Sequence, residues 1–321
     1  MNYKPILIVA GEPNSVFLEI FFKSIKTHRY KSPLIIISSK KLLEQQMKKL
    51  GFFFEINTIS KNFTKFDTLN NKKINLINIE YKFDNCFEKI SSQSNGYIKS
   101  SFELALKIIK QNKLSKLING PISKKYFLKG KTLGITEYLA KNTKKTNKVV
   151  MLIFNNKLSV SPLTTHLALK DVNKKISKQK IYQHVKLITE FYKKRFNKNP
   201  TIAITGLNPH CESNFKSCEE EAIIIPAIKQ LKLKKFNVNG PFPADTIFIK
   251  DNLKNYDVII GMYHDQVLAP MKALFNFDAI NITLGLPFIR ISPDHGPNTS
   301  MLGKNLSDPK SLINALKFLD N

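Results

Sequence analysis

The sequence has no tryptophan, little arginine and no long apolar run. Of its 51 basic residues only Arg29, Arg195 and Arg290 are arginines. No segment reaches the roughly 18 uninterrupted apolar residues of a membrane span. The apolar run Pro5–Ala10 passes directly into a turn and lacks the longer core and cleavage site of a signal peptide. We therefore expect no membrane association.

Cysteine is also scarce. The three cysteines, Cys86, Cys211 and Cys218, form an odd set without a CxxC pair of the metal-binding kind. This usage is typical of a protein kept reduced, and we expect a cytoplasmic location.

The formal net charge of +27 comes from lysines spread along the whole chain. A nucleic-acid interface would gather its positive charge on one face and interleave it with arginines and aromatic residues. We therefore expect no nucleic-acid partner, although a lysine-rich binding protein without enzymatic activity remains an alternative. The charge should still attract anionic substrates.

Apolar strand-like runs alternate with helix-like periodicity along the chain. Runs such as 34–37, 201–205 and 258–262 predict buried strands, and segments such as 181–192 predict amphipathic helices. Val149–Phe154 and Leu158–Val160 suggest adjacent strands. The alternation predicts an α/β fold with a largely parallel sheet, and 321 residues suffice for two domains.

Three histidines share one position in this pattern. His166, His210 and His264 each follow a strand-like run, where a loop or helix begins. If the strands are parallel, the three loops open on one edge of the sheet, where ligands bind in open α/β sheets. Three imidazoles with an open fourth position suit a catalytic zinc or a similar divalent ion. The alternative is that each histidine caps an element or lies in the core; His184, in the middle of a helix, is expected to be solvated.

An anion-binding set is predicted near the same edge. Thr136, as the N-cap of a short helix, can present a phosphate to the helix N-terminus. Lys272, Asn281 and Arg290 can complete the set, with Arg290 ending an apolar strand. A structural salt bridge is the alternative for Arg290. Asp245 and Asp265 are candidates for orienting ligands or transferring protons, or else for caps and turns.

Several motifs together resemble one enzyme family. GLNPH, GPFPADT, YHDQVLAPMKAL, FDAINITLGLPFIR and SPDHG are similar to 4-hydroxythreonine-4-phosphate dehydrogenase of pyridoxal-phosphate biosynthesis, and THLALKDV and GPISK fit the same family. The resemblance runs from about Gly120 to Gly296. It implies two α/β/α domains with a cleft between them, related in fold to isocitrate and isopropylmalate dehydrogenases. It also implies a homodimer whose active site lies in that cleft and is completed by the partner subunit.

On this resemblance we expect one domain from residues 1–125 with 285–321 and a second, carrying the metal ligands, from 126–284. The family's metal ligands fall on His166, His210 and His264. Its substrate-binding residues fall on Thr136, Lys272, Asn281 and Arg290. We predict catalytic roles for Asp245 and Asp265.

The implied reaction is metal-assisted oxidation of 4-phosphohydroxy-L-threonine, followed by decarboxylation to 3-amino-2-oxopropyl phosphate. The expected cofactors are NAD or NADP and a divalent metal, with zinc ahead of magnesium, manganese or cobalt. No GxGxxG follows a strand, so the usual dinucleotide fingerprint is absent. By similarity to the related dehydrogenases, the candidate cofactor loop is Asp294, His295 and Gly296.

Two positions depart from the family pattern. Ile135 stands where the family usually has a histidine before the phosphate-loop threonine, and 14–19 replaces a glycine-rich N-terminal loop. A related dehydrogenase acting on another phosphorylated hydroxy acid therefore stays open. A zinc hydrolase, which would use the same three histidines with a metal-bound water, is a separate alternative.

Overall fold

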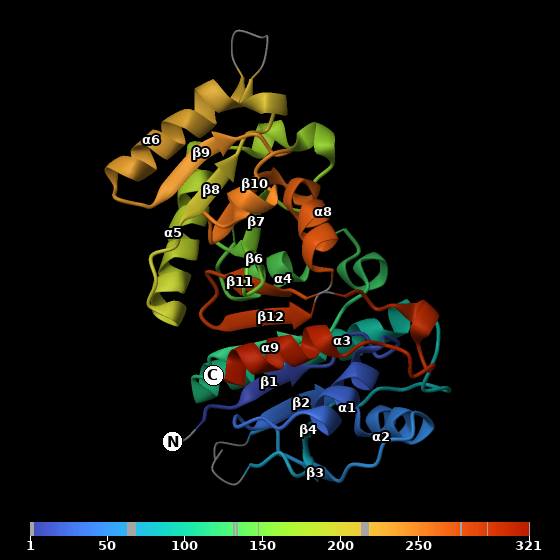
Figure 1. Ribbon diagram of the computed structural model, residues 1–321. Helices are drawn as coiled ribbons and strands as arrows, with labels where there is room; N and C mark the ends of the chain where they lie inside the picture. Colours follow the sequence, from blue (N-terminus) through green and yellow to red (C-terminus); the bar gives the residue numbers. More distant parts are fainter. Residues whose placement is uncertain are drawn as a thin grey trace. The chain divides into compact units, whose positions relative to one another are not determined.

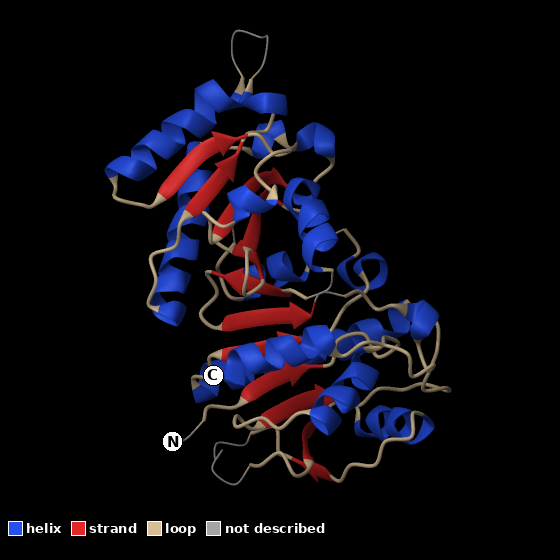
Figure 2. Cartoon of the chain, viewed as in Figure 1, coloured by secondary structure: helices blue, strands red, loops and turns tan. Residues whose placement is uncertain are grey.

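The computed structural model describes residues 3–62, 69–130, 132, 134–146, 148–212, 218–276, 278–293 and 295–320. The chain forms two compact units, Met1–Ile135 with Pro287–Asn321 and Thr136–Leu286. Each unit combines a sheet with packed helices, so the predicted α/β class is confirmed (Figure 2). The chain passes from one unit to the other after residue 135 and again after residue 286. The boundaries expected from the sequence, after residues 125 and 284, lie a few residues earlier in both cases.

The first unit is built on a parallel sheet with the strand order β3-β4-β2-β1-β5-β12. Figure 1 shows the red helix α9 next to the blue strand β1, which comes from the other end of the chain. The strands are β1 (Ile6–Val9), β2 (Leu34–Ser38), β3 (Ile56–Thr58), β4 (Ile74–Asn78), β5 (Lys116–Asn119) and β12 (Ile289–Pro293). The helices are α1 (Phe17–Thr27), α2 (Lys40–Lys49), η1 (Ser92–Ser94), α3 (Asn95–Asn112), η2 (Lys124–Leu128), η7 (Thr299–Met301) and α9 (Lys310–Asp320).

The apolar runs of this unit become strands because helices cover the sheet. All four residues of β1 are fully buried. Helix α3 packs against β1 and β2, while α9 packs against β12 and β1 and contacts α1. A parallel sheet covered in this way selects continuous Ile, Leu and Val runs over alternation.

The second unit contains a mixed sheet with the order β11-β6-β7-β10-β8-β9. β7, β10, β8 and β9 are parallel neighbours, and β6 runs antiparallel to β7 and β11. The strands are β6 (Val150–Phe154), β7 (Ser159–Thr164), β8 (Ile202–Thr205), β9 (Val238–Phe242), β10 (Val258–Tyr263) and β11 (Ile280–Leu284). The helices are α4 (Ile135–Asn142), η3 (Leu169–Asp171), η4 (Asn173–Lys175), α5 (Lys178–Phe196), η5 (Pro209–Cys211), η6 (Glu220–Ile224), α6 (Ile225–Leu233), α7 (Lys250–Leu253) and α8 (His264–Phe275).

The core of this unit lies between the sheet and α8. Val267 and Met271 of α8 join buried residues of β7, β8 and β10, including Val160, Ala203 and Ile259. Val267 and Met271 are four residues apart, so they lie on one face of the helix. This packing fixes α8, and with it the residues at its first turn.

Helix α5 corrects one prediction. His184 is only 4% exposed, and its Nδ1 lies 3.0 Å from the Lys180 carbonyl oxygen. Burial lowers the pKa of its imidazole to about 4, so the side chain is neutral at neutral pH. The expectation of a solvated His184 was wrong because this position faces the sheet.

The three cysteines form no disulfide. Within the described ranges, every helix is too short or too polar to span a bilayer.

Candidate active site

The three predicted histidines follow three neighbouring parallel strands. His166 lies two residues beyond β7, His264 begins α8 directly after β10, and His210 lies in η5 after β8. Because β10 pairs with both β7 and β8 in parallel, all three histidines stand at the carboxyl edge of the sheet. The rings of His166 and His264 are adjacent, with their centroids 5.7 Å apart.

Asp265 orients His264. The Nδ1 of His264 lies 2.7 Å from Oδ1 of Asp265. A carboxylate only accepts hydrogen bonds, so Nδ1 carries the proton and the lone pair is on Nε2. The acidic side chain also stands in the first turn of α8, where the helix dipole favours negative charge. Asp265 therefore prepares His264 to bind a cation through Nε2.

The loop that carries His210 is held by a buried glutamate. Glu220 Oε1 accepts hydrogen bonds from the backbone N–H groups of Leu207 (2.7 Å) and Asn208 (2.8 Å), and its Oε2 accepts from the Asn208 side-chain amide at 2.8 Å. Burial raises the pKa of the Glu220 carboxyl, but these hydrogen bonds outweigh it, and the pKa lies below its usual value. Glu220 is therefore a buried carboxylate anchor for this loop.

The anchor supports a strained backbone. His210 and Cys211 have φ values of 57° and 61°, in the left-handed region that most side chains avoid. Such residues cost on the order of 1 kcal/mol or more each and persist where the surroundings impose them. Here the strain presents the exposed His210 side chain at the end of β8.

Gln266 links the His210 and His264 segments. Its Oε1 accepts from the Met262 N–H at 2.6 Å and from the Thr205 hydroxyl at 2.8 Å, and its Nε2 donates to the Gly206 carbonyl at 2.8 Å. The side chain thus ties the ends of β8 and β10 together. The roles of Gln266 and Glu220 were not predicted from the sequence. Each is a polar residue in the first turn of an otherwise apolar helix, and this pattern could have indicated a buried hydrogen-bonding role.

The histidines fit a divalent metal in chemistry and in strand placement. Imidazole nitrogens suit zinc and other transition metals. The rings of His166 and His264 are adjacent, and the third histidine, His210, follows the next strand, β8. Within the part of the chain that the structure describes, no group of three or more His, Cys, Asp or Glu residues is close enough to hold a metal ion. The three-histidine set therefore stays a prediction.

A second part of the site lies where α4 meets β11. The hydroxyls of Thr136 and Thr283 are 3.5 Å apart. Asn281 lies two residues from Thr283 on the same face of β11, and its Oδ1 is buried without a hydrogen-bond partner among the described residues. Thr136 lies inside the first turn of α4, which begins at Ile135, and is not the predicted N-cap. It is 6% exposed.

Glu137 connects this part to the histidines. It follows Thr136 directly, and its Oε1 accepts a hydrogen bond from the Thr165 hydroxyl at 3.3 Å. Thr165 immediately precedes His166. A continuous run of contacts therefore joins the predicted phosphate-binding threonine to the paired histidines.

Lys272 and Arg290 differ in their surroundings. Lys272 is half-buried on α8, eight residues beyond His264, and burial lowers the pKa of its ammonium group. Arg290 is fully buried in the first unit, where its Nε donates to Asn119 Oδ1 at 2.6 Å. Arg290 is the second residue of β12, so the prediction that it ends a strand was wrong.

The remaining predicted residues are dispersed. Asp245 is exposed in the turn after β9. Burial raises the pKa of the Cys211 thiol, and the negative charges of Glu220 and then Asp245 raise it further. His295 Nδ1 lies 2.8 Å from the Gly296 carbonyl oxygen, and burial lowers the pKa of its imidazole. Asp294 lies outside the described residues.

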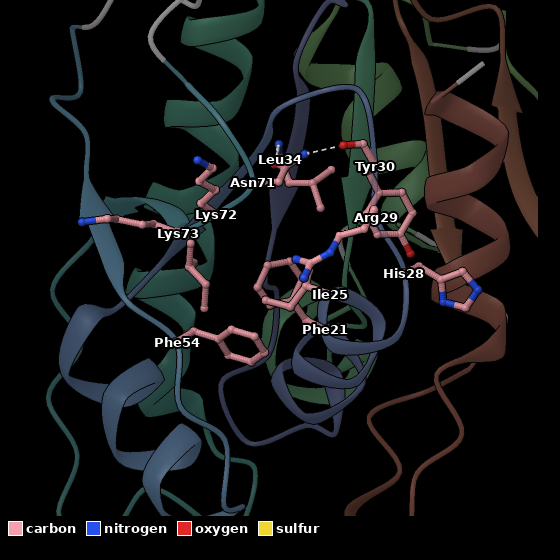
Figure 3. A pocket seen from close by; sticks show the side chains of 11 residues that line it. Phe21, Ile25, His28, Arg29, Tyr30, Leu34, Phe54, Asn71, Lys72 and Lys73 are labelled. Carbon is pink, nitrogen blue, oxygen red and sulfur yellow. Dashed lines mark hydrogen bonds between the residues drawn. The ribbon is translucent and has the colours of Figure 1, made fainter.

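A cavity in the first unit has a different character. It measures about 50 Å³, far below the roughly 300–1,000 Å³ of a typical ligand pocket. Figure 3 shows its lining, which comes from α1, the turn after it and the starts of β2 and β4. It contains none of the predicted site residues and lies away from the carboxyl ends of these strands.

Comparison with known proteins decides the family. The family described as "Pyridoxal phosphate biosynthetic protein PdxA" matches residues 29–319. The chain belongs to this family. It is 36% identical over 318 residues to a 4-hydroxythreonine-4-phosphate dehydrogenase of Sulfurihydrogenibium sp. (strain YO3AOP1), with 98% of this chain and 96% of the relative covered. The resemblance inferred from the motifs is thereby confirmed.

Two further relatives extend the comparison. A putative D-threonate 4-phosphate dehydrogenase of Oceanobacillus iheyensis is 33% identical, covering 98% of this chain and 97% of the relative. The crystal structure of a 4-hydroxythreonine-4-phosphate dehydrogenase from Klebsiella pneumoniae superposes with a TM-score of 0.84 at 25% identity, covering 99% of this chain and 97% of that one. This PdxA-family chain is an oxidoreductase acting on a CH–OH group, and a dehydrogenase of this kind implies a nicotinamide cofactor. These relatives favour neither the hydrolase nor the non-enzymatic alternative.

Proposed function

We propose that the chain oxidises 4-phosphohydroxy-L-threonine with NAD or NADP and that the product loses its carboxylate to give 3-amino-2-oxopropyl phosphate. This reaction belongs to pyridoxal 5'-phosphate biosynthesis. The observation that carries the proposal is the family match over residues 29–319, joined to histidines at the ends of three adjacent parallel strands.

His166, His210 and His264 would hold a divalent metal, with zinc expected before magnesium, manganese or cobalt. Such an ion supplies a Lewis acid that lowers the pKa of the substrate hydroxyl and stabilises charge during decarboxylation. Asp265 fixes the imidazole of His264 through the 2.7 Å contact, and Gln266 and Glu220 hold the His210 loop. Asp245 is proposed as a proton acceptor, because it is exposed beside the His210 loop.

Thr136, Lys272, Asn281 and Arg290 are proposed to bind the substrate phosphate. Hydroxyl, amide and cationic groups supply the donors that a phosphate accepts. Fixing the phosphate orients the reacting carbon and can contribute several kcal/mol to lowering the barrier. Bound NAD or NADP would supply the hydride acceptor for this carbon, whose hydroxyl gives up its proton. The oxidised product then loses carbon dioxide and takes up a proton in place of the carboxylate. Asp294, His295 and Gly296 are proposed to contact the cofactor.

A spectrophotometric assay for reduced nicotinamide tests the proposal. The purified chain should reduce NAD or NADP when given 4-phosphohydroxy-L-threonine, and treatment with a chelator should abolish turnover until metal is returned. His210→Ala should lose most bound metal on elemental analysis while keeping its circular dichroism spectrum. Full metal occupancy and activity in that variant would exclude the three-histidine site.

We further propose that the active form is a homodimer in which the subunits share their sites. The family resemblance motivates this proposal. It can be tested by mixing inactive His166→Ala with inactive Lys272→Ala. If these residues act from different subunits, some hybrid sites regain both intact groups and activity returns. No recovery after demonstrated subunit exchange would mean that one chain supplies both.

D-threonate 4-phosphate is a second candidate substrate. The Oceanobacillus iheyensis relative named for that compound is almost as similar as the first. Ile135 also leaves one phosphate-side position without its usual family histidine. Assaying both compounds side by side separates the two candidates.

A further inference from the structure

Glu137 carries a carboxylate oxygen that the proposed reaction has not yet used. Its Oε1 accepts from the Thr165 hydroxyl, but its Oε2 is buried and has no hydrogen-bond partner among the described residues. A carboxylate oxygen removed from water without a donor is costly, and native structures rarely leave one so. Such an oxygen marks a place where a donor or cation from outside the chain can bind.

The chain has no lack of cations with which to satisfy this carboxylate. It contains 51 lysines and arginines, and Glu19, which is only 2% exposed, pairs its Oε1 with Lys23 at 2.8 Å, although its Oε2 is also buried without a hydrogen-bond partner among the described residues. In the described ranges, no lysine or arginine forms an ion pair with Glu137. The carboxylate is therefore available for a ligand.

Its position matches one group of the proposed substrate. Glu137 directly follows Thr136, a proposed phosphate ligand, and accepts a hydrogen bond from Thr165, the neighbour of His166. The substrate has its phosphate on C4, its reacting hydroxyl on C3 and an ammonium group on C2. With the phosphate near Thr136 and the hydroxyl near the histidines, a carboxylate between them can reach the ammonium. An ammonium supplies three donors to the unsatisfied oxygen.

We propose that Glu137 binds the substrate ammonium and thereby sets the preference for an amino acid over a hydroxy acid. This inference rests on the proposed function. The two named relatives are described as acting on one compound of each kind, because D-threonate 4-phosphate carries a hydroxyl in place of the ammonium. A hydroxyl can also donate to the carboxylate, but only the ammonium adds charge. Hydrogen bonds between charged groups contribute more than neutral ones.

The test is the substrate preference of Glu137→Gln, a nearly isosteric change that removes the charge and replaces one acceptor oxygen with an NH₂ group. With 4-phosphohydroxy-L-threonine we expect kcat/KM to fall about 10- to 100-fold, from the energy of a hydrogen bond to a charged group. With D-threonate 4-phosphate we expect a change below about 3-fold, because no charge pair is lost. The weakened binding should also appear as a raised Kd in calorimetric titrations.

Thr165→Val is the matched control. If Glu137 acts only by holding Thr165 beside His166, this variant should reproduce the effects of Glu137→Gln on both compounds. If Glu137 binds the ammonium, Thr165→Val should leave the ratio of the two kcat/KM values near that of the wild type.

The outcomes separate this inference from the proposed function. A wild-type protein that oxidises neither compound, or only the threonate, would overturn both. A wild type that favours the amino substrate, with an unchanged preference in Glu137→Gln, would overturn the Glu137 inference alone. Loss of the preference in Glu137→Gln, with the preference retained in Thr165→Val, supports it.

Discussion

Two buried glutamates, one in each unit, hold the loop that follows a strand, and the pKa values of their carboxyl groups are shifted in opposite directions. Glu12 lies in the turn after β1 and is 2% exposed, and Glu220 anchors the loop after β8 and is fully buried. Burial raises the pKa of the Glu12 carboxyl. The pKa of Glu220 is lowered in spite of burial.

The difference lies in the donors. Glu12 accepts two long hydrogen bonds, from the Asn14 N–H at 3.3 Å and the Ser94 hydroxyl at 3.1 Å. Glu220 accepts hydrogen bonds of 2.7 and 2.8 Å from two backbone N–H groups, and one of 2.8 Å from the Asn208 amide. Several short donors outweigh the cost of desolvation, and two long ones do not. The loop with the firm anchor is the one that carries a predicted metal ligand, His210.

The largest expected effect comes from removing the firm anchor. Glu220→Gln keeps one acceptor oxygen for the Leu207 and Asn208 N–H groups, but it removes the charge and places an NH₂ group against the Asn208 side-chain amide, which loses this acceptor. We expect a loss of about 2–3 kcal/mol in the free energy of unfolding, measured by urea denaturation. Metal affinity should fall as well, because the His210 loop is released. Glu221→Gln, a change at the neighbouring and exposed position, is the control and should change neither quantity. Unaltered stability in Glu220→Gln would contradict the role of the carboxylate as an anchor.

Sequence reasoning located the strands and the histidines but missed the anchors, and the reason is physical. The run from Val258 and the position of His264 just after it depend on local apolar patterning and turn chemistry. Glu220 acts on residues 12 and 13 positions away, and Gln266 on Gly206, 60 positions away. Such contacts depend on how the elements meet in space.

The same limit explains two errors. Arg290 was expected at the end of a strand, but its partner Asn119 is 171 residues away on the adjoining strand β5. His184 was expected to be solvated, because helical periodicity alone does not say that a polar residue faces the sheet. In both cases a buried polar group is satisfied by a distant or backbone partner that no local pattern reveals.

His184 offers the next test. Burial lowers the pKa of its imidazole, whereas burial raises the pKa of the Glu12 carboxyl. The folded-state pKa of His184, about 4, lies below the usual 6.5. The unfolded chain therefore gains a proton first as pH falls, and stability present above pH 6.5 is lost progressively down to about pH 4. The expected loss is on the order of 2–3 kcal/mol. Urea denaturation across this range should show it in the wild type but not in His184→Gln. An equal decline in both proteins would assign the acid sensitivity to other groups.

Arg290 extends the comparison to a buried cation in the first unit. A guanidinium can grip two phosphate oxygens, whereas an ammonium acts as a point charge. If Arg290 binds the substrate phosphate, Arg290→Lys should reduce kcat/KM by an amount corresponding to about 1.5–3 kcal/mol. An unphosphorylated analogue, already a poor substrate, should show little further loss of kcat/KM in Arg290→Lys. Equal losses for both substrates would mean that the contact with Asn119 serves the fold.

The smallest effect, and one of opposite sign, is expected at Glu12. Its folded-state pKa is raised, so its contribution to stability is fully present below the usual pKa of 4.5 and is lost as pH rises through the folded-state value. At neutral pH the buried charge therefore destabilises the fold. Glu12→Gln removes that charge and keeps an acceptor for Asn14 or Ser94. We expect a gain of at most about 1 kcal/mol at pH 7, shrinking toward zero near pH 4. Parallel urea denaturation of Glu12→Gln and Glu220→Gln at both pH values measures the contrast directly. A loss of stability in Glu12→Gln at neutral pH would mean that its two long hydrogen bonds are worth more than the desolvation they oppose, and that the two glutamates are anchors of the same kind.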